Sequence, residues 1–481
     1  MSSDSGQRQL NPFYGPKTGR CGDFIPFYWD GEYHLFCIQG SPWYHISTRD
    51  FVSFVEHGIA IPSGGPDSQD RDIYTGCVIE KDGLFYIFYT GHNADFDKQG
   101  KFTQVVMLAT SKDLITWTKD PDFRLEPDTS LYSAGGWRDP HVFWNDAEGE
   151  YWMILCSATK EILHKRWGCT PLFTSPDLKN WTSKGPIYAP RLYDSHECPD
   201  MFRIGDWWYL IFSTYTRHWE TRYRMARTPS GPWIVPQPDD LFEGRTFYAA
   251  KTVFDGSRRL IVGWTAVKEG EKDEGKYLWG GNLLVHELVQ RPDGTLGVKL
   301  PDEIRSAFGR PVPLTVVSSS ARGGVSGCST GEWAVDGTSL ACDSLGRFSF
   351  IQLADMPDKC IIRANATFES GTSSLGFMLR MDGDRLENWY QVRLEPGRNR
   401  VVFDRSNRYF VDQSFIEERP VELKAQVPVE LEVVVSGSIV SIHVDNHVAL
   451  TARGYDLTSG SAGLFVEEGS AKFDNVSITT M

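Results

Sequence analysis

Three carboxylic acids, Asp23, Asp139 and Glu197, are far apart in the sequence, but each stands at the beginning of a short apolar or aromatic segment. Segments of this kind are typical of β-strands. If the three acids come together, their mutual repulsion raises at least one pKa and provides a proton donor near neutral pH. Cleavage of a glycosidic bond uses such a pair, with one carboxylate ionised and one carboxyl protonated. Metal binding and a buried ion-pair network are two other common uses of clustered carboxylates.

The elements that would position these acids are five similar hairpins, each consisting of a strand, an acidic or glycine-containing turn, and a second strand. The hairpins cover residues 22–36, 75–89, 138–155, 197–213 and 248–264. A second repeated unit follows the first three hairpins, in which Ser47, Ser111 and Ser175 are separated by steps of 64 residues. A regular period with about four strands per unit is typical of a radial array of sheets. Since no long helical periodicity interrupts it, we predict a five-bladed β-propeller between about residues 20 and 300.

The tips of the innermost strands of a propeller meet at one end of its central channel. Aligned on their turns, the hairpins place the following residues just before these strands: Asp23, Thr75, Asp139, Glu197 and Tyr248. Each acid alone has a simpler interpretation, as a turn residue (Asp23), as half of an ion pair (Asp139) or as a solvated loop acid (Glu197). Their equivalent positions favour a shared site, so we predict that the three acids line one bowl.

The sequence changes character after the predicted propeller. Residues 301–340 are rich in proline, serine and glycine, and the remainder alternates short apolar segments with turns such as Asp382-Gly383. This spacing is typical of a β-sandwich. We therefore predict an all-β chain with a propeller catalytic domain at residues 1–305, a linker at 306–340 and a β-sandwich at 341–481, to which we assign no chemistry.

The composition disfavours several classes of partner. The 481 residues carry a formal net charge of −14, which argues against binding to nucleic acid or to an anionic membrane surface. No apolar run is long enough to span a bilayer, and the first residues have no apolar stretch of the kind found in signal peptides. We therefore expect a cytoplasmic protein, or a secreted one if a signal peptide has been removed.

Cysteine and histidine positions give no sign of a metal site. The nine cysteines contain no Cys-x-x-Cys pair, which favours reduced, buried thiols, although Cys328 and Cys342 could be bridged. His141 and His196 are close to predicted acids in sequence but alternate to the other face of their strands. We predict no metal and no cofactor, and a carbohydrate as the partner, with no nucleic acid and no membrane.

Several short motifs occur in order along the chain and carry the predicted acids. They are Trp137-Arg138-Asp139-Pro140, Glu197-Cys198-Pro199-Asp200, Phe247-Tyr248-Ala249 and Trp279-Gly280-Gly281. Together they resemble glycoside hydrolase family 32, which contains invertases, inulinases, levanases and fructosyltransferases. The resemblance covers about residues 10–305, and a β-sandwich tail is also typical of that family.

The resemblance implies a five-bladed propeller and cleavage with retention of configuration. By this resemblance Asp23 is expected to be the nucleophile, Glu197 the general acid/base and Asp139 a stabiliser of the transition state. The expected reaction is release of fructose from sucrose, fructan or short fructo-oligosaccharides through a fructosyl-enzyme. The residues that we predict to contact the sugar are Arg138, Gln39, Trp43, Thr75, Tyr248 and Trp279.

Two motifs depart from the family pattern. Where the family usually has Asn-Asp-Pro-Asn-Gly, this chain has Cys21-Gly22-Asp23-Phe24-Ile25-Pro26-Phe27-Tyr28, in which the acid is kept and both asparagines are gone, and the usual Ser-Gly-Ser is Thr75-Gly76-Cys77. The missing groups normally shape the sugar subsites, so the reaction class is better indicated than the substrate. The alternatives are a fructosyltransferase, an inverting arabinosidase or xylosidase on the same kind of propeller, and a carbohydrate-binding propeller without catalysis.

Overall fold

The computed structural model describes residues 10–160, 164–314, 332–382, 388–406 and 417–481. Strands make up nearly all of the regular structure, which confirms the predicted all-β class. The described helical elements are short, namely α1 (Asp302–Ser306) and 3-10 turns at Ala94–Gln99, Glu269–Glu271 and Pro396–Arg398. Within the described ranges, no helix is long and apolar enough to cross a membrane.

The chain divides into two compact units. One consists of Met1–Ala266 and Trp279–Leu296, and the other of Val267–Leu278 and Gly297–Met481. The domain limits predicted from the sequence, at residues 305 and 340, stay a prediction. Part of the predicted linker, residues 315–331, lies outside the described residues, as does Cys328, so its suggested bridge to Cys342 cannot be described. The other eight cysteines, all described, are buried and free.

Within the described residues, β1 to β19 form five antiparallel sheets, each built from strands that follow one another in the chain. The first sheet contains β1 (Gly22–Trp29), β2 (Glu32–Ile38), β3 (Trp43–Thr48) and β4 (Phe54–Ile61). The second contains β5 (Asp72–Lys81), β6 (Leu84–His92), β7 (Gln104–Ser111) and β8 (Thr118–Leu125). The third contains β9 (Arg138–Asn145), β10 (Glu150–Ala158), β11 (Gly168–Ser175) and β12 (Thr182–Tyr188). The fourth contains β13 (Glu197–Ile204), β14 (Trp207–Thr214) and β15 (Glu220–Ala226), and the fifth β16 (Phe247–Phe254), β17 (Arg259–Lys268), β18 (Tyr277–Gln290) and β19 (Leu296–Lys299).

The hairpins form because tight turns join strands of matching length. In the first sheet Asp30 and Gly31 have φ values of 48° and 78°, and in the second Asp82 and Gly83 have values of 55° and 77°. Two consecutive residues in the left-handed region are what a type I′ turn requires, and Asp-Gly is a preferred sequence for it. The turn twist matches the twist of the strands, so each hairpin is set locally.

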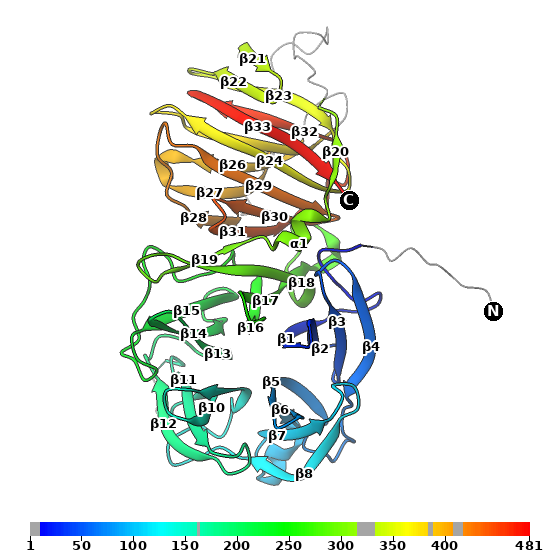
Figure 1. Cartoon of the computed structure of the whole chain (residues 1–481), viewed down its shortest axis with the longest axis vertical. Helices are drawn as coiled ribbons and strands as arrows, with labels where there is room; N and C mark the ends of the chain where they lie inside the picture. Colours follow the sequence, from blue (N-terminus) through cyan, green and yellow to red (C-terminus); the bar gives the residue numbers. More distant parts are fainter. Residues whose placement is uncertain (1–9, 161–163, 315–331, 383–387, 407–416) are drawn as a thin grey trace, which may run out of the picture. The chain divides into compact units, whose positions relative to one another are not determined.

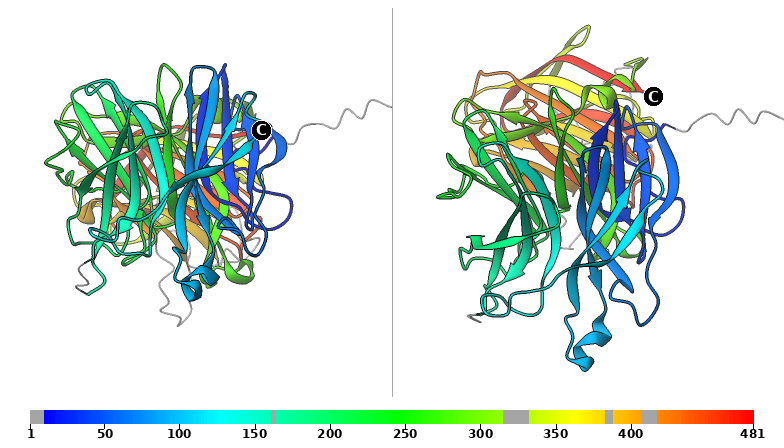
Figure 2. Two further views of the ribbon diagram at one scale, coloured as in Figure 1. Left: turned by 90° about the horizontal axis from the view of Figure 1, so that it is seen from below. Right: turned by 60° about the horizontal axis from the view of Figure 1, so that its bottom comes forward.

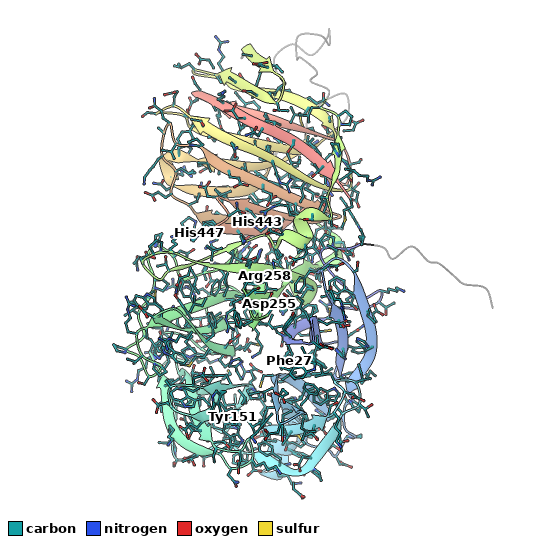
Figure 3. All side chains as sticks on the ribbon, in the orientation of Figure 1. Phe27, Tyr151, Asp255, Arg258, His443 and His447 are labelled. Carbon is teal, nitrogen blue, oxygen red and sulfur yellow. The ribbon has the colours of Figure 1, made fainter. Side chains whose placement is uncertain are left out.

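The first strands of the five sheets contact one another in a cycle, in the order β1, β5, β9, β13, β16 and back to β1. Figure 1 shows these sheets around a common centre, and Figure 2 shows the same strands from two further directions. Between the first and second sheets, Phe27 meets Phe85 edge-on at 5.9 Å between ring centroids. Between the first and fifth sheets, the Tyr33 hydroxyl donates to Asp255 Oδ2 at 2.6 Å, and Asp255 also pairs with Arg258 (Figure 3).

The remaining strands form two further antiparallel sheets. They are β20 (Arg310–Val312), β21 (Glu332–Asp336), β22 (Ser339–Asp343), β23 (Phe348–Asp355), β24 (Lys359–Phe368), β25 (Ser374–Met381), β26 (Trp389–Glu395), β27 (Arg400–Ser406), β28 (Glu417–Pro420), β29 (Val429–Ser436), β30 (Ile439–Val444), β31 (Val448–Arg453), β32 (Ser461–Glu467) and β33 (Ser470–Thr480). One sheet has the order β21-β22-β33-β24-β29-β30-β31, with β20 also paired to β33, and the other β23-β32-β25-β26-β27-β28. Alternate residues of both sheets, such as Ile362 and Leu379, meet in one apolar core.

Candidate active site

A cavity of about 440 Å³ opens at the beginning of the first strands. All three predicted acids line it, together with three of the residues predicted to contact a sugar, Arg138, Tyr248 and Trp279. The complete lining is Asp23, Ile38, Gly40, Ser41, Asp72, Ile73, Tyr74, Arg138, Asp139, Glu197, Cys198, Tyr248 and Trp279. Every one of these residues belongs to the first unit. The folded chain therefore gathers acids from three different sheets into one small space.

A one-residue β-bulge repeats at this end of all five first strands. In β1 the pairing jumps from Gly22 opposite Ile38 to Ile25 opposite Phe36, so β1 has one residue more than its partner. Each of the other four first strands also has one residue more than its partner at this end. The residues at the jump with left-handed φ are Asp23 (51°), Asp139 (59°), Cys198 (47°) and Ala249 (52°). Such bulges re-aim a side chain and are common beside active sites.

The bulges show that the alignment predicted from the sequence is one residue out of register in two strands. Counted from the bulge, the residues equivalent to Asp23 and Asp139 are Cys198 and Ala249. Glu197 is instead equivalent to Arg138, one position earlier. The sequence alignment was based on the acidic side chains, but Glu197 occupies the position before the one that Asp23 and Asp139 occupy in their bulges. The three acids thus reach the cavity from two successive positions along their strands.

Glu197 is held by both of its carboxylate oxygens. Arg138 Nη2 donates to Glu197 Oε1 at 2.7 Å, and the Tyr248 hydroxyl donates to Glu197 Oε2. The same Arg138 nitrogen also donates to Ser195 Oγ at 3.1 Å, two residues before the acid. Because charge-assisted hydrogen bonds from a guanidinium are directional, this arrangement fixes the orientation of the Glu197 carboxylate.

Asp139 is almost completely buried, with 3% of its surface exposed. Its Oδ2 accepts a hydrogen bond from the backbone N–H of Cys198 at 3.0 Å and lies 3.6 Å from Arg138 Nε. Its own N–H donates to Thr90 Oγ1 at 2.8 Å, which anchors the bulge. Burial raises the pKa of Asp139, while the positive charge of Arg138 lowers it.

Asp23 lies in the cavity with one oxygen anchored, since Trp264 Nε1 donates to Asp23 Oδ1 at 3.1 Å. Burial and then the negative charge of Asp139 raise the pKa of Asp23 to about 7, although the hydrogen bond from Trp264 lowers it. The Asp23 carboxyl therefore keeps its proton to a much higher pH than an ordinary aspartate. The charge on this carboxylate responds to small changes in its surroundings.

Aromatic rings form one wall of the cavity beside Asp23. The Trp264 ring stands 6.0 Å from Trp279 and 5.6 Å from Tyr248 between centroids, in edge-on geometry. Gly22 allows this packing, because a Cβ atom at that position would lie 2.9 Å from Trp279 and 3.3 Å from Trp264 Nε1. The Gly22 that replaces an asparagine of the family motif thus makes room for Trp279. Of these rings only Trp279 is exposed, and an exposed aromatic face suits the apolar face of a sugar.

Three residues predicted to contact a sugar are not part of the cavity lining. Trp43 is fully buried and donates its indole N–H to the Tyr74 carbonyl oxygen at 3.0 Å. Thr75 is also buried, at the bulge of β5, and its carbonyl oxygen accepts a hydrogen bond from Thr90. Gln39 donates from its side chain to the Thr18 carbonyl oxygen at 2.9 Å. The geometry gives these three no direct contact with the cavity.

Two polar lining residues were missed in the sequence, Asp72 and Ser41. Ser41 Oγ donates to Asp72 Oδ1 at 3.0 Å, and Asp72 also lies 3.4 Å from Arg71 Nε and 3.5 Å from His92 Nδ1. Asp72 is the first residue of β5, which starts three residues before the predicted hairpin. Asp72 could have been found as an acid at the start of a strand, but the predicted hairpin began at residue 75 and left it out.

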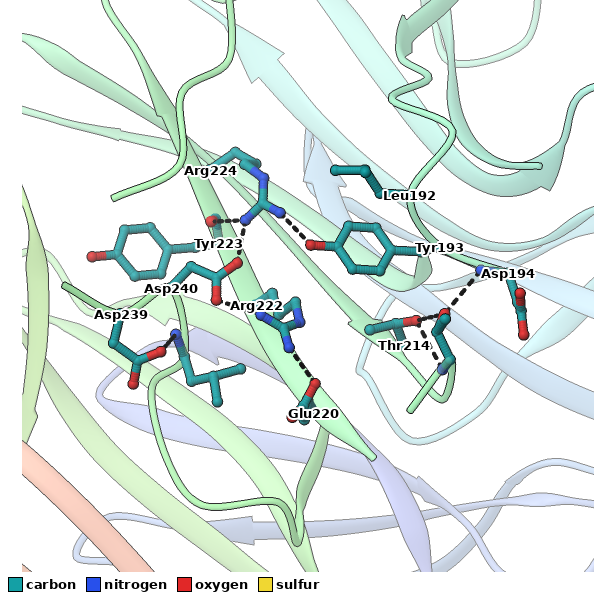
Figure 4. Close-up of polar contacts among 12 residues, drawn as sticks. Leu192, Tyr193, Asp194, Thr214, Glu220, Arg222, Tyr223, Arg224, Asp239 and Asp240 are labelled. Carbon is teal, nitrogen blue, oxygen red and sulfur yellow. Dashed lines mark hydrogen bonds and ion pairs between the residues drawn. The ribbon is translucent and has the colours of Figure 1, made fainter. Parts of the chain in front are cut away.

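The segment that leads into Glu197 is tied to β15 by a buried arginine. Arg224 is 1% exposed, and its guanidinium donates to the Tyr193 hydroxyl at 2.6 Å and the Tyr188 hydroxyl at 2.8 Å. It also pairs with Asp240 Oδ2 at 2.6 Å, and Figure 4 shows Arg224 with Tyr193 and Asp240. Since Tyr193 is four residues before Glu197, the cluster supports the backbone that presents the acid.

The two histidines next to the acids in sequence are not part of the cavity lining. His141 Nε2 lies 3.1 Å from Asp200 Oδ1, and His196 Nδ1 lies 3.0 Å from Thr170 Oγ1. Among the residues that the structure describes, no group of three or more His, Cys, Asp or Glu side chains is arranged to hold a metal ion.

Comparison with known proteins places this site in a family. A family model described as "Glycosyl hydrolases family 32 N-terminal domain" matches residues 24–293. This match spans more than half of the chain and contains Asp139 and Glu197, whereas Asp23 immediately precedes it. All-β chains with clustered acids of this kind are found among glycoside hydrolases. The chain belongs to glycosyl hydrolase family 32, as its motifs had indicated.

Individual relatives agree with this membership. A sucrose-6-phosphate hydrolase from Vibrio alginolyticus is 28% identical over 305 residues, which are 56% of this chain and 58% of that protein. A raffinose invertase from Escherichia coli is 26% identical over 320 residues, 60% of this chain and 64% of that protein. The chain thus matches about three fifths of the length of these curated relatives. The structure of an exo-inulinase from Aspergillus awamori has a TM-score of 0.74 at 16% identity, covering 100% of this chain and 99% of that one, and shows the likeness of fold.

The Arg224 cluster predicts a large effect on stability. In Arg224→Met, two tyrosine hydroxyls lose their donor and Asp240 loses one of its two arginine partners. We expect the free energy of unfolding, measured by urea denaturation, to fall by about 2–4 kcal/mol. Arg203→Met on β13 is the control, because Arg203 is exposed and its side chain bonds only a turn carbonyl. A loss no larger than that of the control would show that the cluster is not stabilising.

The raised pKa of Asp23 predicts that this acid destabilises the fold at alkaline pH. When the pKa of a carboxyl is higher in the folded than in the unfolded chain, the free energy of unfolding falls as pH rises from about 4 through 7. Asp23→Asn removes this charge and keeps an acceptor for Trp264. We expect it to increase the free energy of unfolding by about 4 kcal/mol at pH 8 and by only about 1 kcal/mol at pH 4.5. Equal gains at both pH values, or a gain in the exposed control Asp206→Asn, would contradict this explanation.

Proposed function

We propose that this chain is a retaining glycoside hydrolase that releases fructose from β-fructofuranosides, such as sucrose, fructan or short fructo-oligosaccharides. The observation that carries the proposal is the convergence of Asp23, Asp139 and Glu197 in one cavity, each anchored by a different neighbour. Membership of family 32 supports it, as do the names of the relatives, which include a sucrose-6-phosphate hydrolase, a raffinose invertase and a levanase.

In the first step the ionised Asp23 attacks the anomeric carbon of the fructosyl unit, and Glu197 protonates the departing glycosidic oxygen. The hydrogen bond from Trp264 to Asp23 Oδ1 leaves Oδ2 as the attacking oxygen. Arg138 and Tyr248 hold the Glu197 carboxyl in one orientation, so the proton is delivered along a fixed direction. The products of this step are an ester between fructose and Asp23 and the free leaving sugar.

In the second step a water molecule replaces the leaving sugar. Glu197, now ionised, takes a proton from this water, whose oxygen attacks the same carbon and breaks the ester to Asp23. Asp139 does not form a covalent bond but accepts hydrogen bonds from sugar hydroxyls, which strengthen as positive charge develops on the ring. Arg138 favours the charged form of Asp139, because its guanidinium lies beside the Asp139 carboxylate.

We also propose the architecture expected of this family, a five-bladed propeller at residues 1–305, a linker at 306–340 and a β-sandwich at 341–481. The five antiparallel sheets and the cyclic contacts of their first strands support the propeller. The two later sheets with a common apolar core support the sandwich. The catalytic domain is the propeller, because every cavity-lining residue comes from the five-sheet part of the chain.

Isosteric replacement of the two reacting acids tests the function. Asp23→Asn and Glu197→Gln keep the shapes of the side chains and one acceptor oxygen each, but remove the nucleophile and the proton donor. We expect each to lower kcat for fructose release by at least about 10³-fold. The assay measures fructose from sucrose, inulin, levan and short fructans. Asp206→Asn, in the turn of the hairpin that carries Glu197, should keep full activity, and full activity in either active-site variant would refute the proposal.

The pKa of Asp23 predicts the acidic limb of the pH–rate profile. Since Asp23 must be ionised to attack, kcat/KM should rise with pH through about 7 and level off above it. Trp264→Phe removes a hydrogen bond that lowers this pKa, so the limb should move to higher pH. Trp219→Phe is the matched control, because Trp219 packs on Trp264 and Tyr248 but does not bond Asp23. An unmoved limb in Trp264→Phe would show that another group controls it.

A further inference from the structure

A second cavity, of about 290 Å³, lies at the opposite end of the first strands from the acids, and all of its lining residues belong to the first unit. Trp144 and Arg203, which line it, are the next-to-last residues of β9 and β13, the strands that begin with Arg138 and Glu197. Five residues of extended strand separate Trp144 from Asp139, which corresponds to about 17 Å. Among the described residues, the two cavities have no lining residue in common. This far cavity is therefore a separate site on the same strands.

Four aromatic side chains line the far cavity, namely Phe143, Trp144, Phe202 and Trp208. Trp144 is 45% exposed, and an edge-on contact with Tyr151, at 4.8 Å between ring centroids, supports its indole. The other three rings are buried or half-buried. An exposed indole beside a cavity offers a flat apolar surface, and covering it with the CH groups of a sugar ring removes apolar area from water. Trp144 is therefore the surface on which a ligand would stack.

The charged groups that line the far cavity balance one another. Two arginines and two aspartates line it, namely Arg203, Arg259, Asp146 and Asp200. Burial lowers the pKa of Arg259 and the negative charge of Asp200 raises it, so these two charges offset each other. His141 adds no charge at neutral pH, because burial lowers its pKa to about 4. Lys251, which is 2% exposed, does not line this cavity and also attracts the acids at the other end of the strands. The lining therefore favours an uncharged ligand.

Hydrogen-bonding capacity is left over in this lining. The Arg259 guanidinium lies 4.4 Å from the Phe202 ring centroid and donates from Nη1 to Thr252 Oγ1 at 2.9 Å. Within the described residues it has no further hydrogen bond and no ion pair, and the Asp146 side chain has neither. A sugar hydroxyl both donates and accepts, so it can accept from an arginine and donate to a carboxylate at once. A fully ionised phosphate only accepts, and the two aspartates would repel it.

We propose that the far cavity is a second, non-catalytic binding site for an uncharged saccharide. Trp144 stacks on one sugar unit, while Arg259 and Asp146 bind its hydroxyls. The cavity volume is at the lower end of the range for small-molecule sites, which begins at about 300 Å³, and suits a single sugar unit. A sugar bound here leaves the cavity of the three acids open, so the protein can hold one saccharide there while another occupies the acids. The site itself does not depend on the proposed hydrolysis.

Fluorine NMR of the full-length protein, with fluorotryptophan in place of tryptophan, can follow the two cavities separately. Trp144 and Trp208 report on the far cavity and Trp279 on the cavity of the acids, and a Phe variant of each assigns its signal. Glucose, fructose and inorganic phosphate are titrated one at a time. We expect glucose or fructose to move the Trp144 and Trp208 signals with a dissociation constant in the millimolar range, and phosphate to leave them in place.

Variants locate the binding. Trp144→Ala should raise the dissociation constant, followed through Trp208, by at least about tenfold, and Asp146→Asn should raise it by about threefold. Trp29→Ala is the matched control, because Trp29 is 42% exposed at the end of β1 and does not line the far cavity. Weaker binding in Trp144→Ala but not in Trp29→Ala supports the proposal.

Three results would overturn it. The first is that both sugars move only the Trp279 signal, or none. The second is that phosphate, and neither sugar, moves the Trp144 and Trp208 signals, which would make the far cavity an anion site. The third is that Trp144→Ala binds sugar as tightly as the unaltered protein. Because glucose and fructose are not hydrolysed, a failure of the proposed function would leave this test unaffected.

Discussion

The structure of this site depends on keeping several carboxylates close together in one largely enclosed cavity, where Asp139 is almost completely buried. Burial, and then the neighbouring negative charges, disfavour ionisation and raise the pKa of Asp23 and Asp139. Arg138 offsets this repulsion, because it touches two of the acids at once. The surrounding sheets must hold that arginine in place, since a small displacement would expose one acid to the other without a counter-charge.

The arrangement of strands and much of the site could be predicted from the sequence. Repeated hairpins with acids at their beginnings indicated an all-β fold and identified Asp23, Asp139 and Glu197, all of which line the cavity. Arg138, Tyr248 and Trp279 also lie there, as their motifs had suggested. This worked because turn residues and alternating apolar residues are local signals, which depend little on the rest of the fold.

Other features could not be predicted, because they depend on geometry that one strand does not reveal. A bulge adds one residue without changing the hydrophobic pattern, so the register of Glu197 relative to Asp139 was one residue out. Trp43 and Thr75 turned out to be buried behind the lining. The partners of Arg224 come from segments separated by loops, and no pattern in the sequence links them.

Gly22 and Trp279 show how the two ends of the five-sheet part of the chain constrain each other. The indole ring occupies the volume that a methyl group on residue 22 would need. A larger residue at position 22 therefore requires a smaller residue at position 279, so the two must be substituted together. The width of the cavity thus depends on this pair, while Trp264, whose Nε1 would lie 3.3 Å from the same methyl group and donates to Asp23, must stay in place.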